Sequence, residues 1–384
     1  MEEMTYHWSL VCSASDEKHD ASGLPTVSSL GEPWLVAYDT KPHPDTKALL
    51  SSRPWNMWRY REWMPLAPDE KPVTLGEGCT PLLRAPSLAR GTGVATVWIK
   101  DEGQNPCGSF KARGLSAAIT RATHAGAKSF VIPTAGNAGV ALAAYGQRAE
   151  AEVRVYAPRS TPPRIVEQIE LFGAELQLLD GHIGDCGKAA REYAVASGAF
   201  DMSTLREPYR IEGKKTMGIE IAEQLGWSLP DCIIYPTGGG TGLIGMWKAF
   251  NELREAGWVE GKLPRLYSVQ STGCAPVVKA FEAGALATEP WPDPETIAYG
   301  LRVPGPLGGK IMLRYLKECG GKALAVSDEK LQAAADRIGV REGIDMCPEG
   351  GAAVVALEKL VLEGSIESTD SVVVFNTGAG WLYR

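Results

Sequence analysis

The sequence has no Cys-x-x-Cys motif. Its eight cysteines are widely spaced, and the nearest neighbours, Cys79 and Cys107 or Cys319 and Cys347, are 28 positions apart. This spacing excludes a zinc ribbon and a thioredoxin-type redox pair. A chain of 384 residues can also bury a core large enough to fold without disulfides. We therefore expect reduced thiols.

Long apolar runs and an excess of positive charge are also missing. No stretch approaches the roughly 18–20 uninterrupted apolar residues of a membrane-spanning helix. The acidic N-terminus, Met1–Met4, leads into polar sequence and not into the apolar core of a secretory signal. A net charge of −7 provides no general attraction to nucleic acid or to anionic membranes. We expect a cytoplasmic protein without nucleic-acid or membrane partners, which must bind any anion at a local site.

The composition is that of an ordinary globular protein, and the length suits two or three domains. Residues 1–75 differ from the rest because they are rich in Pro, Trp and charge and have weak periodicity. The segment Trp58–Trp63 interleaves basic and aromatic residues, a pattern that can bind single-stranded nucleic acid by stacking. The negative net charge favours the other interpretation, an N-terminal arm whose rings pack on the main body.

From Val97 onward, short β-branched runs alternate with longer stretches that have apolar residues at helical spacing. The expected strands are Ala95–Lys100, Ser129–Pro133, Val153–Ala157, Glu175–Leu179, Cys232–Pro236, Leu266–Gln270 and Val372–Phe375. The expected helices are Leu115–His124, Ala138–Arg148, Arg164–Phe172, Ile219–Leu225, Leu243–Leu253, Ala275–Phe281, Glu329–Ile338 and Ala352–Leu362. This alternation predicts an open, mostly parallel α/β sheet flanked by helices.

In open parallel sheets, ligands bind beyond the carboxyl ends of the strands, where the next helix begins. One such junction holds Lys111, with Ser109 as a candidate N-cap that places the lysine in the first helical turn. The helix dipole disfavours a cation there, which suits an amine that acts as nucleophile and base. The alternative is a solvated surface lysine.

A second junction is the run Thr134, Ala135, Gly136 and Asn137. Small residues at a helix start free backbone N–H groups to bind a carboxylate, and the Asn137 amide can hydrogen-bond a ring hydroxyl. The alternative is an ordinary strand–helix turn. A similar choice holds for Thr377 after the last expected strand, where a hydroxyl can hydrogen-bond a heterocyclic nitrogen or simply belong to a turn.

A third junction is the glycine loop Gly238, Gly239, Gly240, Thr241 and Gly242, which can wrap a phosphate with backbone N–H donors. It is no P-loop, because Leu243 and Ile244 follow in place of Lys-Ser/Thr. Gly240-x-Gly242-x-x-Gly245 matches the dinucleotide pattern. The next expected strand, however, ends in Gln270-Ser271-Thr272 and supplies no carboxylate for a ribose. We therefore favour a small phosphomonoester.

Taken together and in order, these elements resemble the pyridoxal-phosphate enzymes of the tryptophan-synthase-β, or fold type II, family, and within it the threonine synthases. The matching motifs are Trp58–Glu62, Gly76–Leu82, Asn105–Lys111, Thr134–Asn137, Glu212–Gly218, the glycine loop, Cys347–Gly350 and Asn376–Gly378. The resemblance implies two α/β domains with pyridoxal 5'-phosphate in the cleft between them. It implies a homodimer and a small-molecule amino-acid substrate.

The resemblance also implies site residues. Lys111 would hold the cofactor as a Schiff base and remove the substrate's α-proton, and Asn137 would contact the ring oxygen. The glycine loop, Gly238–Gly242, would cradle the phosphate, and Thr377 would hydrogen-bond the pyridine nitrogen. The backbone of Thr134–Asn137 would bind the substrate carboxylate. In threonine synthases the reaction converts O-phospho-L-homoserine and water to L-threonine and phosphate.

The sequence departs from the family pattern at three places that bear on the substrate or on metals. Position 112 is alanine where many relatives have aspartate, and Trp381-Leu382 replaces a common Leu-Lys pair. Cys12 stands alone where some relatives carry a cysteine-rich ribbon, so no structural metal is expected. Candidate cations for a substrate phosphate are Arg113, Arg206, Lys214, Lys215, Arg302 and Lys310.

We predict an N-terminal arm over residues 1–75, a larger cofactor-binding domain from 76–113 plus 206–384, and a smaller α/β domain over 114–205. The predicted function is a threonine synthase-like lyase. The alternatives are a pyridoxal-phosphate-dependent serine/threonine dehydratase or another β-eliminating or β-replacing lyase, an NAD-dependent oxidoreductase, and a binding protein without catalysis.

Overall fold

The chain forms two compact units in a computed structural model that describes residues 7–384. Unit 1 comprises the chain up to Cys79 and Lys111–Thr216, and unit 2 comprises Thr80–Phe110 and Met217–Arg384. The chain therefore passes between the units three times. Lys111 is the first residue after the second passage.

Unit 1 contains two sheets. The arm forms a three-stranded antiparallel sheet in the order β2-β1-β3, with β1 (Trp8–Cys12), β2 (Lys18–His19) and β3 (Trp34–Tyr38). The second sheet is parallel, in the order β8-β7-β6-β9. Its strands are β6 (Ser129–Pro133), β7 (Glu152–Pro158), β8 (Glu175–Leu179) and β9 (Phe200–Asp201).

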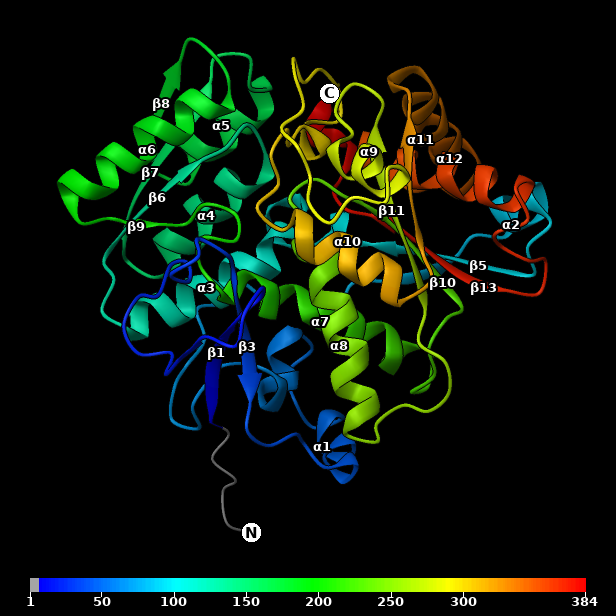
Figure 1. Cartoon of the computed structure of the whole chain (residues 1–384), viewed down its shortest axis with the longest axis horizontal. Helices are drawn as coiled ribbons and strands as arrows, with labels where there is room; N and C mark the ends of the chain where they lie inside the picture. Colours follow the sequence, from blue (N-terminus) through cyan, green and yellow to red (C-terminus); the bar gives the residue numbers. More distant parts are fainter. Residues whose placement is uncertain (1–6) are drawn as a thin grey trace. The chain divides into compact units, whose positions relative to one another are not determined.

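Helices cover both faces of the parallel sheet in unit 1. They are α3 (Lys111–His124), α4 (Asn137–Arg148), α5 (Pro163–Leu171) and α6 (Ile183–Ser197), with the short α1 (Lys47–Leu50) in the arm. The strand order runs outward from β6 to β8 and then returns to β9. Right-handed crossovers therefore place α6 on the face opposite α4 and α5 (Figure 1).

The aromatic residues of the segment Trp58–Trp63 are buried, whereas Trp55 is 64% exposed. The segment Met57–Trp63 forms a 3-10 helix in which Trp58, Tyr60 and Trp63 are all buried. Trp58 packs in a cluster with Ala117 of α3, and its indole Nε1 donates to Oε1 of Glu77 at 2.8 Å. These rings are not exposed for stacking on a nucleic acid, and the prediction that the arm packs its rings on the body is confirmed.

Unit 2 is built on a six-stranded sheet in the order β12-β11-β10-β13-β5-β4. All neighbouring strands are parallel except the edge strand β4, which is antiparallel to β5. The strands are β4 (Leu82–Arg84), β5 (Thr96–Asp101), β10 (Cys232–Pro236), β11 (Arg265–Ser271), β12 (Lys322–Val326) and β13 (Ser371–Asn376). The central strands β10 and β13 are continuous apolar runs because both of their faces are covered.

Two layers of helices cover this sheet. Helices α11 (Asp328–Glu342) and α12 (Pro348–Leu362) lie on one side, and α8 (Thr241–Glu255) and α10 (Gly309–Glu318) lie on the other (Figure 1). The remaining helices are α2 (Pro86–Thr92), α9 (Pro276–Glu282) and α7 (Tyr209–Gln224), which contains the boundary between the units. None of the helices within residues 7–384 combines the length and hydrophobicity needed to cross a membrane.

The predicted α/β class, with mostly parallel sheets flanked by helices, is confirmed. The compact units are drawn differently from the predicted domains. The arm belongs to unit 1. Residues 206–216, which the prediction assigns to the larger domain, also belong to unit 1. The predicted domains, which group the residues by cofactor binding, stay a prediction.

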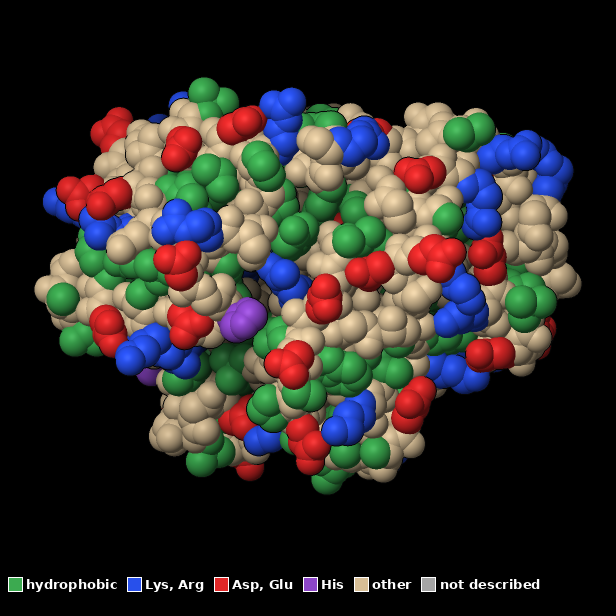
Figure 2. Space-filling model, turned by 90° about the horizontal axis from the view of Figure 1, so that it is seen from above, with side chains coloured by type: hydrophobic (Ala, Val, Ile, Leu, Met, Phe, Trp, Pro, Cys, Tyr) green, Lys and Arg blue, Asp and Glu red, His purple; other side chains and the backbone are tan. Residues whose placement is uncertain are grey.

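The molecular surface carries both signs of charge. On the face drawn in Figure 2, Lys and Arg side chains are interspersed with Asp and Glu. The net charge of −7 is therefore not gathered into one acidic field on this face.

A buried ion pair stabilises unit 2. Lys100 Nζ lies 2.6 Å from Oε1 of Glu220 and also donates to Thr80 O at 2.7 Å, and both charged side chains are inaccessible to solvent. We expect Lys100→Met to lower the free energy of unfolding by about 3–5 kcal/mol, because it leaves the Glu220 carboxylate buried without its cation. Urea unfolding measures this loss.

The matched control is Arg164→Met, which removes an exposed pair with Glu167 at 2.9 Å. Exposed pairs contribute about 0–1 kcal/mol, so the control is expected to unfold close to the wild type. An equal effect of the two substitutions would contradict the stabilising role of Lys100.

Candidate active site

Three neighbouring strands of unit 2 place candidate residues at one edge of the sheet. Strand β13 lies between β10 and β5 and is parallel to both, with Ile234 opposite Val374 and Asp101 opposite Asn376. The carboxyl ends of parallel neighbours meet at the same edge. Thr377, which follows β13, is therefore beside the start of the glycine loop that follows β10.

Two glycines of the glycine loop have no room for a side chain. A Cβ on Gly238 would overlap the carbonyl oxygen of Gly300, and one on Gly242 would overlap the hydroxyl of Tyr235. Gly240 has a φ of +85° and is the N-cap of α8, where no side chain caps the helix. The N–H groups of the first turn of α8 are thus left to an anion, and bare backbone can approach it closely.

Thr377 lies in a buried, neutral environment. Its side chain is 5% exposed, and its Oγ1 is 3.7 Å from Sγ of Cys347. Burial and the nearby Glu349 raise the pKa of the Cys347 thiol well above its usual range, so this partner is uncharged. The Cys347 N–H donates to Oδ1 of Asn376 at 3.1 Å, which fixes the thiol beside the strand end.

The segment before Lys111 is bonded to the same strand end. Ser109 pairs with Gly378, and the Phe110 N–H donates to the carbonyl of Thr377 at 3.1 Å. Helix α3 begins with the next residue, so the prediction that Lys111 lies in the first helical turn is confirmed. The candidate N-cap at Ser109 is wrong, because its buried Oγ has no hydrogen-bond partner within residues 7–384 and the helix starts two residues later.

In unit 1, the run Thr134–Asn137 follows β6 and leads into α4. Gly136 is the N-cap of α4 and makes no side-chain capping bond, while its N–H donates to Oγ1 of Thr134 at 3.2 Å. The threonine thereby orders the turn. No side chain caps this end of α4, and the predicted binding of a carboxylate here stays a prediction.

The candidate cations fall into two groups. Arg113, Lys214 and Lys215 are buried, and Arg206, Arg302 and Lys310 are more exposed. Two of the buried ones have internal partners: Arg113 Nη1 donates to Thr216 Oγ1 at 3.1 Å, and Lys215 Nζ lies 2.6 Å from Glu212 Oε2.

Sequence reasoning missed a second buried acid–base pair on the chain just before these lysines. Arg210 and Glu207 are both inaccessible, with Nε and Oε1 separated by 3.9 Å. Burial raises the pKa of Glu207 to about 8. Alternating charged and apolar residues gave no signal of burial here, because the pattern equally suits an exposed helix start.

Glu349 belongs to the Cys347–Gly350 motif, for which the sequence predicts no role, and it supports the glycine loop through Gly300. Its Oε1 accepts from the Gly300 N–H at 2.8 Å, and Gly300 O is the atom that excludes a side chain at Gly238. Burial raises the pKa of the Glu349 carboxyl. This acid supports the segment on which the glycine loop rests.

The structure gives no support to a dinucleotide site at the same loop. A dinucleotide site needs an acidic side chain at the end of β11 to bind the ribose. Gln270 occupies this end of the strand and is fully buried. Its Oε1 accepts from the Val277 N–H at 2.8 Å, and its Nε2 donates to Thr237 O at 3.2 Å. The Gln270 carboxamide therefore stabilises the loop at Thr237, and it is not an acid that could bind a ribose.

A comparison with known families decides the class. The model of the family described as "Pyridoxal-phosphate dependent enzyme" matches residues 73–378. The chain belongs to this family. The site fits the cofactor, because a loop with no room for side chains at Gly238 and Gly242 can seat a phosphate and the neutral Thr377 hydroxyl can meet a ring nitrogen. Lys111 directly follows Phe110, which is bonded to Thr377.

Curated relatives of this pyridoxal-phosphate enzyme are threonine synthases. The one from Methanocaldococcus jannaschii is 31% identical over 372 residues, which is 96% of this chain and 91% of the relative. That from Methanosarcina acetivorans is 35% identical over 324 residues, with coverages of 84% and 79%. That from Mycobacterium tuberculosis is 34% identical over 322 residues, with coverages of 84% and 86%.

Solved structures agree on the fold. Maize serine racemase superposes with a TM-score of 0.69 at 21% identity, covering 78% of this chain and 88% of its own. The processed form of threonine deaminase isoform 2 from Solanum lycopersicum gives 0.67 at 21% identity, with coverages of 78% and 83%. The chain is therefore a fold type II pyridoxal-phosphate enzyme, and the predicted cofactor and lyase class are confirmed.

Proposed function

We propose that this enzyme converts O-phospho-L-homoserine and water to L-threonine and phosphate. The observation that carries the proposal is the similarity to threonine synthases along almost the whole chain, with 96% of its residues aligned to the Methanocaldococcus jannaschii enzyme. The substrate is the finer part of the proposal, because enzymes of the same fold act on several amino acids.

Pyridoxal phosphate, when bound, supplies an electron sink that stabilises negative charge on the α-carbon of an amino acid. We assign its covalent attachment to Nζ of Lys111, and the same nitrogen accepts the substrate's α-proton. The lysine starts α3, and the positive end of the helix dipole disfavours its ammonium form.

The other assigned residues bind and orient. The backbone of Gly238–Gly242 holds the cofactor phosphate, the Thr377 hydroxyl meets the pyridine nitrogen, and Asn137 contacts the ring oxygen. The N–H groups of Thr134–Asn137 bind the substrate carboxylate. Thr377 and the neighbouring Cys347 thiol are both uncharged, so neither gives the ring nitrogen a carboxylate partner. We expect this to favour elimination over transamination.

A serine/threonine dehydratase is the second candidate, and one contact favours it. A Cβ on Gly108 would come within 3.2 Å of the Trp381 ring and would overlap the Leu382 side chain. These two residues replace the common Leu-Lys pair, so a departure from the family pattern lies against the segment that leads to Lys111. Leu382 in place of the lysine of that pair removes one cation that a substrate phosphate can use.

The two candidates are separated by their products. With O-phospho-L-homoserine we expect release of phosphate together with L-threonine, and with L-serine or L-threonine we expect at least about 100-fold lower kcat/KM for release of ammonia and a 2-oxo acid. Coupled phosphate and ammonia assays on the holoenzyme measure both. Ammonia release as the faster reaction would overturn the synthase proposal and establish the dehydratase.

The homodimer and the cytoplasmic location stay predictions.

A further inference from the structure

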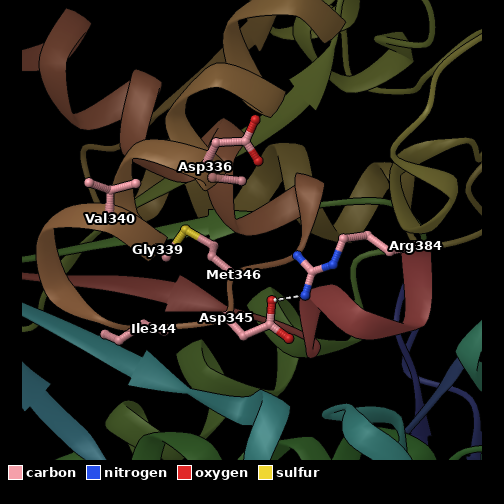
Figure 3. A pocket seen from close by; sticks show the side chains of 8 residues that line it. Asp336, Gly339, Val340, Ile344, Asp345, Met346 and Arg384 are labelled. Carbon is pink, nitrogen blue, oxygen red and sulfur yellow. Dashed lines mark hydrogen bonds and ion pairs between the residues drawn. The ribbon is translucent and has the colours of Figure 1, made fainter.

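The open pocket beside α11 in unit 2 has a volume of about 260 Å³, but its polar side chains do not converge. Figure 3 shows Asp345 and Arg384 paired with each other, while the Asp336 carboxylate and Val340 lie away from this pair. Polar groups do converge in unit 1, where five donors meet at one carboxylate. It belongs to Glu77, whose side chain is fully buried.

The first carboxylate oxygen of Glu77 is bound from the arm and from helix α3. The Trp58 indole Nε1 donates to Oε1 at 2.8 Å, and the Ser116 hydroxyl of α3 lies 2.5 Å from the same oxygen. The Ser116 hydroxyl also lies 2.7 Å from the carbonyl oxygen of Val73, so it is shared between two acceptors. Oε1 therefore links α3 to the segment that carries Glu77.

The second carboxylate oxygen is bound from helix α4. The buried Tyr145 hydroxyl of this helix donates to Oε2 at 2.7 Å. Two further donors come from the turn that contains Glu77, namely the Thr74 hydroxyl at 3.1 Å and the Leu75 N–H at 2.9 Å. No basic side chain within residues 7–384 forms an ion pair with Glu77, so neutral donors alone satisfy its carboxylate.

Both of these helices begin at a residue assigned to the active site. Helix α3 begins at Lys111, five residues before Ser116, and α4 begins at Asn137, eight residues before Tyr145. The carboxylate thus binds the two helices roughly 8 Å and 12 Å from their first residues. The helices also pack against each other (Figure 1). Because a fully satisfied buried polar group restricts packing to one arrangement, Glu77 restricts how the starts of α3 and α4 lie relative to each other.

We propose that Glu77 is a positioning residue, which holds the Lys111 amine at the working distance from the turn Thr134–Asn137. In the proposed function this amine accepts the α-proton while the turn binds the carboxylate of the same amino acid. Their separation therefore decides whether the proton is within reach, and a misplacement of about 1 Å can lower a rate by about 100-fold. The inference rests on the site residues of the proposed function and not on the identity of the substrate.

Replacing Glu77 with glutamine is expected to lower kcat by about 10- to 100-fold and to change KM by less than about threefold. The carboxamide has one acceptor oxygen and one NH2 group, so either orientation turns N–H donors toward the donors of one helix. Tyr145→Phe and Ser116→Ala each remove the link to one helix, and each should lower kcat by about 3- to 10-fold. The two combined should lose no more than Glu77→Gln, because both act through the same carboxylate.

Thr74→Val is the matched control for Tyr145→Phe. It also removes a hydroxyl that donates to Oε2, but Thr74 lies on neither helix, so kcat should stay within about twofold of the wild type. Rates are measured on the holoenzyme per bound cofactor, first as turnover of O-phospho-L-homoserine. The second assay follows by NMR the exchange of the α-hydrogen of L-threonine in deuterium oxide. A variant that only folds less well contains less bound cofactor, and its rates per cofactor are unchanged.

The proposal is overturned if cofactor-loaded Tyr145→Phe and Ser116→Ala react at the wild-type rate, if Thr74→Val loses as much as they do, or if only KM changes. The exchange assay separates this outcome from a failure of the proposed function. A wild type that exchanges the α-hydrogen of L-threonine but makes none from O-phospho-L-homoserine refutes the synthase, and the exchange rates of the variants then decide the role of Glu77. A wild type that is inactive in both assays overturns both proposals.

Discussion

Replacing Lys111 with alanine is expected to lower kcat by at least about 1,000-fold. The amine carries two roles in the proposal, covalent attachment of the cofactor and transfer of the α-proton, and loss of a positioned general base alone costs about 100- to 10,000-fold. Lys111 is the first residue of α3 and directly follows Phe110, whose N–H donates to the carbonyl of Thr377. Initial rates with O-phospho-L-homoserine measure the loss.

Lys188→Ala is the matched control, because Lys188 lies on α6 with a 76% exposed side chain and only a distant partner in Glu192. It should retain wild-type activity. Borohydride treatment supplies a second readout, since it fixes the cofactor to the wild-type chain and to Lys188→Ala but not to Lys111→Ala. Turnover near the wild-type rate in Lys111→Ala would refute the assignment.

Gly238→Ala is expected to weaken pyridoxal-phosphate binding by about 10- to 100-fold. The added methyl group overlaps the backbone carbonyl of Gly300, and this carbonyl cannot simply move away because the Gly300 N–H is held by buried Glu349. Overpacking of this kind costs about 1–3 kcal/mol. We expect the loop to shift to relieve the overlap, which weakens its binding of the phosphate by the corresponding factor. Titration of the cofactor-free protein with pyridoxal phosphate, followed by absorbance, measures the change.

The control for the added methyl group is Gly184→Ala, which lies in α6 with open space around it. Alanine suits a helix better than glycine by roughly 0.5–1 kcal/mol, so this variant should bind the cofactor normally and unfold at a slightly higher temperature. Circular dichroism establishes that Gly238→Ala is folded. Unchanged cofactor affinity in a folded Gly238→Ala would show that the loop does not seat the phosphate.

The parts of the fold that could be predicted are those with a strong local pattern. Ser129–Pro133 and Cys232–Pro236 have the predicted bounds, because uninterrupted β-branched runs between turn residues indicate strands covered on both faces. The junction residues could be predicted for the same reason. A glycine loop or a threonine directly after such a strand must fall at the carboxyl edge of the sheet, whatever the rest of the chain does.

The parts that could not be predicted depend on contacts between distant segments. The strands β1 to β3 of the arm are only two to five residues long, and they are stabilised by pairing with one another. The strand β12, Lys322–Val326, has only weak alternation and is stabilised by its pairing with β11. Likewise, nothing local distinguishes the buried Arg210 from an exposed arginine, because its burial comes from packing and not from its neighbours in sequence.

The position of β13 has a consequence for synthesis on the ribosome. This strand comes from residues 371–376, yet it occupies the slot between β5 and β10. Until the last few dozen residues have left the exit tunnel, the nascent sheet has a gap with two unpaired strand edges, which are prone to wrong pairing. A nonsense or frameshift lesion upstream of Ser371 therefore does more than shorten the polypeptide. It leaves a product that quality-control machinery must remove.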